Sequence, residues 1–311
     1  MTRTVAITGG SGFIGSHVVD RLIDVGVSAR VVDLRPPHRS DVEWRPAELC
    51  DLKQMVDATK GADVVMHLAA MADVNDVIDA PTESVATNTL GTANVLEASR
   101  RNAVNRVVLA STVWVYSASK DARVDETTPI DLDTDRHLYV STKIAAEMIC
   151  RDYFHLYGLP YTVLRFGIPY GPRMRSRMVI GSFIQRALRG EPLVIEGDGA
   201  QERSFVYVED LARAHLLALD ERAANRTYNL EGAEKISIRQ LAELVRHIMG
   251  DVVIDYRPGR AGDYSAREVS SQRAATELGW RPEVSFAEGL GRTVEWFRSL
   301  AADGPQTVAH R

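Results

Sequence analysis

The sequence predicts an α/β fold in which a doubly wound parallel sheet is followed by a smaller C-terminal α/β lobe. Up to about residue 166, apolar strand-like runs alternate with helical runs, the pattern that builds a parallel sheet covered on both faces. The runs at residues 64–69 and 106–110 are nearly all apolar, as strands buried on both faces are. After Gly171-Pro172 the elements become shorter and are broken by Gly and Pro, which predicts the second lobe.

Length and composition exclude several classes of protein. At 311 residues the chain exceeds the usual size of one core, so two lobes are expected, or one domain with a large extension. The formal charge is −5 with acids and bases interleaved, so no basic face is available for nucleic acid. No apolar stretch approaches the length of a membrane span, so a membrane partner is not expected. Cys50 and Cys150 are too few for a disulfide framework or a metal site, which predicts reduced thiols, no metal and a cytoplasmic location.

The first strand and helix enclose a glycine-rich turn. An apolar run at residues 5–8 precedes Gly9, Gly12 and Gly15, and a helical run starting with Phe13 and Ile14 extends to Gly26. Glycines at this spacing allow a tight turn whose backbone N–H groups meet a pyrophosphate at the positive end of the helix. The turn therefore predicts a dinucleotide site.

The second strand selects between two dinucleotides. The run at residues 29–33 ends on Asp33, eighteen residues past Gly15, where a carboxylate accepts a hydrogen bond from the adenosine ribose. Asp33 therefore favours NAD. Arg35 keeps NADP open as the alternative, because a nearby guanidinium can hold a 2′-phosphate.

The remaining elements complete the sheet and its cover. Further strands are predicted at residues 42–46, 64–69, 107–111 and 161–166, and long helices at 84–102 and 139–157. Both helices carry apolar residues at helical spacing. Two interpretations stay open: the helices pair between the subunits of a homodimer, or their apolar faces only cover the sheet.

Four side chains outside the turn are candidates for chemistry. Tyr139 and Lys143 are four residues apart at the start of a helix, so both project from one face. A nearby ammonium and an oxidised nicotinamide would lower the pKa of the Tyr139 hydroxyl and make it a general base. Ser111 and Thr112 close the strand before it, at the sheet edge where α/β folds bind ligands.

This ordered set resembles the extended short-chain dehydrogenase/reductase superfamily, in its branch of NAD-dependent nucleotide-sugar epimerases and dehydratases. The likeness covers nearly the whole chain and is closest to UDP-glucose 4-epimerases. It is carried by the glycine turn, Tyr139-x-x-x-Lys143 and further motifs, which are Cys50-Asp51-Leu52, His67-Leu68-Ala69-Ala70, Asn88-x-x-Gly91-Thr92, Leu164-Arg165-Phe166, Gly197-Asp198-Gly199, Arg203-Ser204-Phe205 and Arg260-Ala261-Gly262-Asp263.

The resemblance implies a Rossmann-type domain over residues 1–169, rejoined by about 204–230, a nucleotide-sugar-binding lobe at 170–300 and a tail at 301–311. It implies that the catalytic residues are Thr112, Tyr139 and Lys143. The implied NAD contacts are Gly9, Gly12, Phe13, Ile14, Gly15, Asp33, Asp51, Leu52, Leu68, Ala69, Ala70, Asn88, Ser111, Tyr139, Lys143 and Phe166.

For the substrate, the resemblance implies that Arg203 and Arg260 grip the diphosphate, and guanidinium forks do match phosphate oxygens. The implied substrate contacts also include Thr112, Val194 and Asp263. The loop after Gly171-Pro172 contributes Arg175 and Arg177, for which we hypothesise binding of an acidic sugar; a solvated basic loop is the alternative. Ile168 stands where many family members have a sugar-contacting Asn, which leaves the sugar and the nucleobase open.

The residues after Thr112 select the reaction. Family dehydratases and decarboxylases carry a carboxylate there, whereas this chain has Val113 and Trp114. The prediction is therefore epimerisation at C4 of a UDP-glucose or UDP-glucuronate type of sugar through a transient 4-keto intermediate. The alternatives are an NAD-dependent oxidoreductase that releases or reduces a ketone, and a non-catalytic NAD-sensing regulator.

Overall fold

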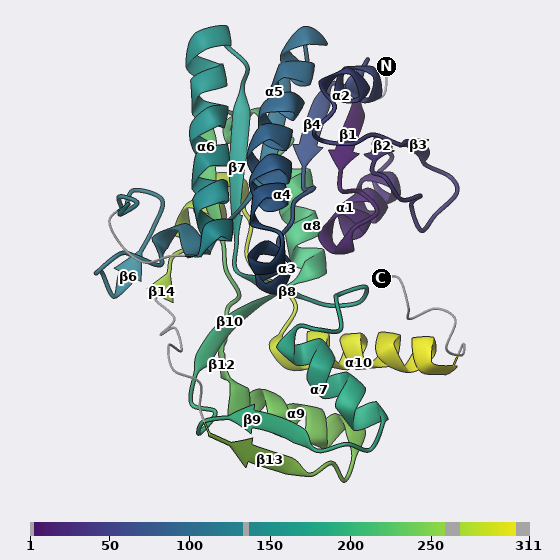
Figure 1. Cartoon of the computed structure of the whole chain (residues 1–311), viewed down its shortest axis with the longest axis vertical. Coiled ribbons are helices and arrows are strands. Elements are labelled where there is room, and N and C mark those ends of the chain that lie inside the picture. The colour runs from purple at the N-terminus through teal and green to yellow at the C-terminus, as the bar shows by residue number, and fades with distance from the viewer. Residues whose placement is uncertain (1–2, 133–136, 259–267, 303–311) are drawn as a thin grey trace. The chain divides into compact units, whose positions relative to one another are not determined.

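The structure is a computed structural model that describes residues 3–132, 137–258 and 268–302 (Figure 1). The chain divides into two compact units. Unit 1 comprises Met1–Phe166, Leu211–Leu230 and Glu268–Arg281, and unit 2 comprises Gly167–Asp210, Glu231–Arg267 and Pro282–Arg311.

Unit 1 is built on a seven-stranded sheet in the order β11-β7-β5-β4-β1-β2-β3, in which every pairing is parallel. The predicted doubly wound sheet is confirmed, and the strand order reverses between β1 and β4, where such sheets bind ligands. The strands are β1 (Thr4–Thr8), β2 (Ser28–Val32), β3 (Glu43–Arg45), β4 (Val64–His67), β5 (Arg106–Thr112), β7 (Tyr161–Phe166) and β11 (Arg226–Leu230).

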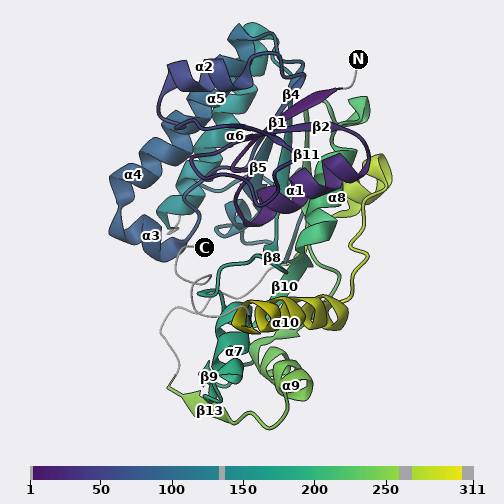
Figure 2. The ribbon, with the colours of Figure 1, turned by 90° about the vertical axis from the view of Figure 1, so that its right-hand side faces the viewer.

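Helices cover both faces of this sheet, with α2, α5 and α6 on one face and α1 and α8 on the other (Figure 2). The helices are α1 (Phe13–Asp24), α2 (Leu52–Thr59), α3 (Val74–Asp79), α4 (Pro81–Val85), α5 (Gly91–Arg101), α6 (Leu138–Tyr157) and α8 (Val208–Leu217). Short helical turns are η1 (Ala86–Leu90), η2 (Val113–Tyr116), η3 (Glu221–Ala223) and η4 (Ala274–Leu278). A separate two-stranded pair joins β6 (Arg123–Val124) to β14 (Glu268–Val269).

The two predicted long helices have different outcomes. The helix predicted at residues 139–157 is present as α6, and Gly158 ends it in the left-handed conformation, with φ 69°. The helix predicted at 84–102 is divided into α4, the π-helical turn η1 and α5. A π-turn widens the helix locally, and such turns often occur at functional sites.

The described residues of unit 2 form two small sheets and three helices. Strand β10 pairs with β8 and β12, and β9 pairs with β13. Its core includes the buried rings of Tyr170, Tyr207, Phe205 and Phe286. The strands are β8 (Ile168–Tyr170), β9 (Leu193–Glu196), β10 (Glu202–Tyr207), β12 (Lys235–Ser237) and β13 (Ile254–Arg257), and the helices are α7 (Val179–Leu188), α9 (Ile238–Met249) and α10 (Phe286–Ala302).

Candidate active site

The glycine turn connects β1 to α1 at the reversal point of the sheet. Gly9 has φ +73°, and a Cβ atom there would lie 2.7 Å from the backbone nitrogen of Ala69, beyond β4. A Cβ atom on Gly15 would lie 2.1 Å from the carbonyl oxygen of Gly9. Both positions therefore require glycine, because any side chain would collide with backbone that cannot move away.

The start of helix α1 is suited to an anion. Gly12 is the N-cap residue, so the cap supplies no side-chain hydrogen bond, and the first turn contains no acidic residue. The first N–H groups of a helix have no partner within the helix, and the helix dipole favours negative charge there. Phe13 and Ile14 lie in this turn, where the sequence predicted a pyrophosphate.

Asp33 follows β2 beside the glycine turn. Its carboxylate accepts hydrogen bonds from the backbone nitrogens of Ser11, at 3.2 Å, and Arg35, at 3.0 Å. The Arg35 side chain is exposed. The sequence predicts that the turn binds the pyrophosphate and that Asp33 binds the ribose. The two hydrogen bonds join these features directly and hold the Asp33 carboxylate at the edge of the site.

A buried hydrogen-bond chain sets the loop after β4. His67 contacts Thr8 through Nδ1, at 2.7 Å, and Thr92 through Nε2, at 3.0 Å. Since the Thr92 hydroxyl donates to the carbonyl of Asn88 at 2.6 Å, it accepts from His67, whose proton then lies on Nε2. Burial lowers the pKa of His67 to about 3, so the ring is neutral.

Asn88 shapes the same loop from the π-turn. Its side chain accepts from the backbone nitrogen of Met71 at 2.8 Å and donates to the carbonyl of Met71 at 2.9 Å. It also donates to Thr142 on α6 at 3.1 Å. Asn88 thus holds the loop that contains Leu68, Ala69 and Ala70.

Thr112, Tyr139 and Lys143 are brought together by β5 and α6. Lys143 is buried and its Nζ donates to the carbonyl oxygen of Ala110 at 3.0 Å. The same Nζ lies 5.9 Å from the centre of the Tyr139 ring. Tyr139 packs on the apolar cluster formed by η2, which directly follows Thr112. The predicted trio therefore converges at the carboxyl end of a central strand.

Burial acts on both titratable members of this trio. It raises the pKa of the Tyr139 hydroxyl above its ordinary value. It lowers the pKa of Lys143 to about 8, against the opposing effect of the Glu147 carboxylate. In the protein alone Tyr139 is thus a neutral phenol, and the lowered pKa expected from the sequence must come from the charge of a bound ligand.

Three other predicted contacts, which are Asp51, Ser111 and Phe166, have side chains engaged within the protein. Asp51 caps α2 and accepts from the backbone and the side chain of Gln54, and Leu52 begins that helix. Ser111 donates from Oγ to the buried carboxylate of Glu147 at 2.7 Å. Phe166 ends β7, with its ring centre 5.5 Å from that of His215.

Glu147 and Arg165 were not predicted as site residues. Glu147 lies one turn after Lys143 on α6, and Arg165 lies in the otherwise apolar strand β7; their side chains are 1% and 4% exposed. A charge inside an apolar strand was the available signal, because such a charge requires a buried partner.

The predicted substrate residues belong mainly to unit 2. Arg203 lies in β10 and Val194 in β9, and Arg175 and Arg177 precede α7. Arg203 donates to the carbonyl of Glu202 at 2.8 Å. Arg260 and Asp263 lie outside the described residues.

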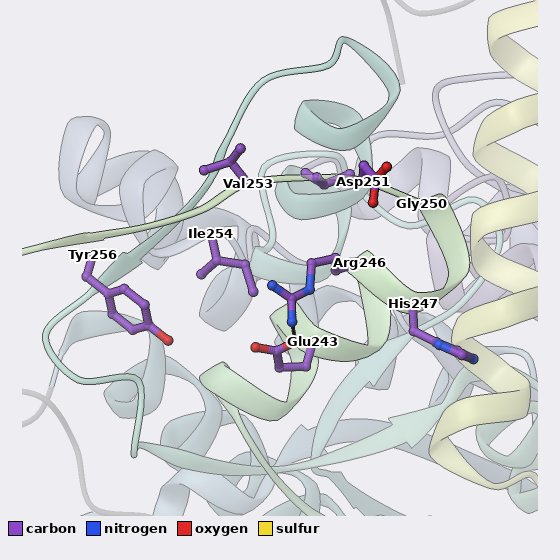
Figure 3. A pocket seen from close by; sticks show the side chains of 9 residues that line it. Glu243, Arg246, His247, Gly250, Asp251, Val253, Ile254 and Tyr256 are labelled. Carbon is purple, nitrogen blue, oxygen red and sulfur yellow. Dashed lines mark hydrogen bonds and ion pairs between the residues drawn. The ribbon is translucent and has the colours of Figure 1, made fainter.

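Unit 2 also contains an open pocket of about 870 Å³ at the end of α9 (Figure 3). Glu243 and Arg246 form an ion pair on its wall, and Val253 and Tyr256 line it from the β13 side. Among the described residues, none of those predicted to bind NAD or substrate lines this pocket.

The described residues contain no helix that is both long enough and apolar enough to span a membrane. They also contain no group of three or more His, Cys, Asp and Glu side chains placed to hold a metal ion.

Comparison with known proteins agrees with this geometry. Residues 5–230 match the model of the NAD dependent epimerase/dehydratase family. A putative UDP-glucose 4-epimerase of Methanocaldococcus jannaschii is 32% identical, over 95% of this chain and 98% of that protein. A UDP-glucuronate 4-epimerase of Thermodesulfobacterium geofontis is also 32% identical, over 93% and 94%.

Among solved structures, the UDP-glucose 4-epimerase of Thermotoga maritima with UDP-glucose is 34% identical and superposes with a TM-score of 0.88, over 96% of this chain and 99% of that one. The family model covers well over half of the chain, and the relatives match it along nearly its whole length. The chain therefore belongs to the NAD-dependent epimerase/dehydratase family.

Proposed function

We propose that this protein epimerises a nucleotide sugar at C4, with NAD as cofactor and a transient 4-keto sugar as intermediate. The observation that carries the proposal is the convergence of Lys143 and Tyr139 on the end of β5, where Thr112 is the last residue. This places a phenol, an ammonium and a hydroxyl at the sheet edge that binds ligands in this fold class.

The residues around the glycine turn fit NAD. A Cβ on Gly9 would collide with Ala69 and a Cβ on Gly15 with Gly9, so only glycine allows the tight turn that a pyrophosphate needs, and the first turn of α1 offers uncapped N–H groups. Asp33 would accept from the adenosine ribose, which favours NAD over NADP. When bound, NAD supplies the hydride acceptor and donor for C4.

Side chains of the protein would carry out the proton transfer. Tyr139 would take the proton of the sugar 4-hydroxyl and return it, with Thr112 holding that hydroxyl in place. Lys143, fixed against Ala110, would stabilise the phenolate form of Tyr139 through its positive charge. The substrate's diphosphate would be held by Arg203, with Arg260 and Asp263 proposed from their motif alone.

The side chains after Thr112 favour epimerisation over elimination or decarboxylation. Val113 and Trp114 occupy η2, so no carboxylate follows Thr112. The protein therefore has no acid or base at these positions that could promote elimination or decarboxylation of the keto sugar. If the keto sugar rotates within the site, hydride can return to the opposite face of C4, which would complete an epimerisation.

The substrate class is a UDP-sugar of the glucose or glucuronate type, as in the named relatives. Arg175 and Arg177 give a specific reason to include the uronic acid, since a guanidinium can pair with its carboxylate. Turnover of UDP-glucuronate and UDP-glucose by Arg175→Ala and Arg177→Ala variants tests this; equal effects on both sugars would contradict it.

We also propose a homodimer formed through α6 and the α4-to-α5 segment. Met148, Leu156 and Tyr157 expose 55%, 70% and 55% of their surface on α6, and Val85 and Leu90 are exposed at 42% and 51%. Large apolar side chains gathered on neighbouring helices favour a contact with a second copy.

A cytoplasmic location is proposed from the cysteines. Cys50 and Cys150 are both free thiols. Thiols stay reduced in the cytosol, whereas secreted proteins commonly pair them.

The test is to incubate the purified protein with UDP-, dTDP- and GDP-sugars and to follow the sugars by NMR and NADH by absorbance. The proposal predicts interconversion of C4 epimers without net NADH. Release of NADH with a keto sugar would indicate the oxidoreductase, and bound NAD without turnover of any sugar would indicate the sensing regulator.

A further inference from the structure

Glu147 is the centre of a buried hydrogen-bond network beside the proposed catalytic residues. Its Oε1 accepts from Ser111 Oγ at 2.7 Å and from Arg165 Nε at 2.8 Å. Its Oε2 accepts from Arg165 Nη2 at 2.6 Å and from Arg151 Nη2 at 3.0 Å. Each carboxylate oxygen thus has two donors, which is the condition under which a buried charge is tolerated.

The network continues across the sheet. Arg165 also donates to the hydroxyl of Tyr116, which in turn donates to Asn229 Oδ1 at 3.1 Å. Ser111, Arg165 and Asn229 are direct partners on β5, β7 and β11. The carboxyl ends of three parallel strands are therefore tied to one another and, through Glu147, to helix α6.

Glu147 and Lys143 hold consecutive residues of β5. Lys143 donates to the carbonyl of Ala110, and Glu147 accepts from the hydroxyl of Ser111, the neighbour of Thr112. One anchor permits the helix to rotate about the contact, whereas two anchors one turn apart fix both its rotation and its height. Tyr139, one turn before Lys143, is placed by the same two anchors.

We propose that Glu147, paired with Arg165, is a positioning residue that sets the geometry of Tyr139 and Lys143 relative to Thr112. The effect of this positioning on catalysis rests on the proposed function. A buried ion pair adds little to stability compared with apolar side chains of similar volume, so geometry is the stronger reason for one here.

The charges around the pair define its pH behaviour. Lys143 faces Glu147 and Cys150 on its own helix, Tyr139 one turn earlier and neutral His67 on β4. Glu147 faces Arg151 on its own helix and Arg165 on β7. Burial alone would raise the pKa of Glu147, but the hydrogen bonds and charge of Arg165 hold it below its usual value. Glu147 is therefore ionised, and its charge favours the protonated form of Lys143.

The experiment compares wild type with Glu147→Gln and with the double variant Glu147→Leu and Arg165→Met. The double variant removes the Glu147–Arg165 pair as a unit, so neither of these two charges is left buried without the other. We expect kcat to fall about 10- to 100-fold in both, as for a small misplacement of reacting groups, with KM changed less than about threefold. The alkaline limb of the kcat profile should move to lower pH, because Lys143 loses a stabilising charge.

A second measurement does not need turnover. Lys143 is one of five lysines, and in protein carrying ¹³C-lysine a Lys143→Arg variant assigns its signal. We expect the pKa of Lys143, about 8 in wild type, to fall in Glu147→Gln. If wild type converts no sugar but this pKa still falls, the proposed function fails while the interaction of Glu147 with Lys143 stands.

Asp210→Asn is the matched control. Asp210 is 2% exposed and accepts from the backbone nitrogens of Glu283 and Val284, both in unit 2. Its loss should lower thermal stability without moving the pH profile. Wild-type kcat and an unchanged Lys143 pKa in folded Glu147 variants would overturn the proposal.

Discussion

At the scale of single residues, the glycine turn depends on two positions, Gly9 and Gly15, that have a hydrogen atom in place of Cβ. A Cβ on Gly15 would lie within 2.1 Å of the Gly9 carbonyl oxygen, and a Cβ on Gly9 would lie 2.7 Å from Ala69 nitrogen. The turn thus depends on the absence of side chains, and we expect the neighbouring carboxylate of Asp33 to select which dinucleotide binds.

Replacing Asp33 with Ala should weaken NAD binding and reduce the preference over NADP. The ribose would lose a hydrogen bond to a charged carboxylate, and the affinity for NAD should fall about 10- to 100-fold. The positive charge of Arg35 would remain beside the site. Calorimetric titration with both dinucleotides measures the change. The exposed carboxylate of Asp41, paired with Arg39, provides the control variant Asp41→Ala. An unchanged ratio of the two affinities would contradict the role of Asp33.

Residues were predictable where a local pattern carries the chemistry. The turn glycines, Asp33, Tyr139 and Lys143 all have a spacing that can be recognised along the chain. The partner of Ser111, which is predicted to contact the cofactor, was not predictable: its hydroxyl donates to Glu147, 36 residues away in the sequence. Such a partner depends on how α6 packs on β5, which no local pattern contains.

At the scale of elements, the alternation of strand-like and helical runs predicted most of unit 1. Strands β1, β2, β3, β4, β5 and β7 and helix α6 occur close to the predicted residues. The π-turn η1 was not predicted, because apolar periodicity cannot distinguish one added residue in a helix. A Cβ on Gly91 would lie 2.9 Å from that of Leu49, and Asn88 holds Met71, so packing explains the break. The pair β6 and β14 joins segments far apart in the sequence, beyond any local signal.

Charges placed on α6 should separate the proposed dimer. Leu156→Glu combined with Met148→Lys puts two charges on exposed apolar positions, and buried unpaired charges are costly at an interface. We expect a monomer in analytical ultracentrifugation, with the helix content unchanged. Val253→Glu, at a position 65% exposed in unit 2, is the control and should leave the assembly intact. A double variant that sediments as wild type would contradict this interface.

At the scale of the whole molecule, both units are assembled from separate parts of the chain. The sequence predicted a return to the first domain near residues 204–230, and unit 1 contains Leu211–Leu230. The further return at Glu268–Arg281 was not predicted, because it depends on pairing with β6 and packing of η4.

The stability of the molecule should depend on the protonation of Glu231. Burial raises its pKa to about 8, against a hydrogen bond with Ser204. Between the ordinary value of 4.5 and about 8 the folded state holds a proton that the unfolded state releases, so this group costs stability as the pH rises. Glu231→Gln should therefore raise the free energy of unfolding at pH 8 by roughly a few kcal/mol. Below the ordinary pKa of a glutamate it should leave the free energy of unfolding unchanged.

Thermal unfolding of wild type and Glu231→Gln across this pH range measures the difference. Glu243→Gln, an exposed glutamate on α9, should show no such pH dependence. A gain for Glu231→Gln that is the same at acid and alkaline pH would contradict the assignment.

The central claim is that Tyr139 transfers the proton during epimerisation on bound NAD. The most direct measurement is the rate of C4 interconversion by ¹H NMR in wild type and Tyr139→Phe, together with the NAD content of each protein. We predict a loss of about 10²- to 10⁴-fold in rate with NAD retained, since only the hydroxyl is removed. Tyr153→Phe, on the same helix, should keep the wild-type rate. A Tyr139→Phe protein that epimerises at the wild-type rate would contradict the account.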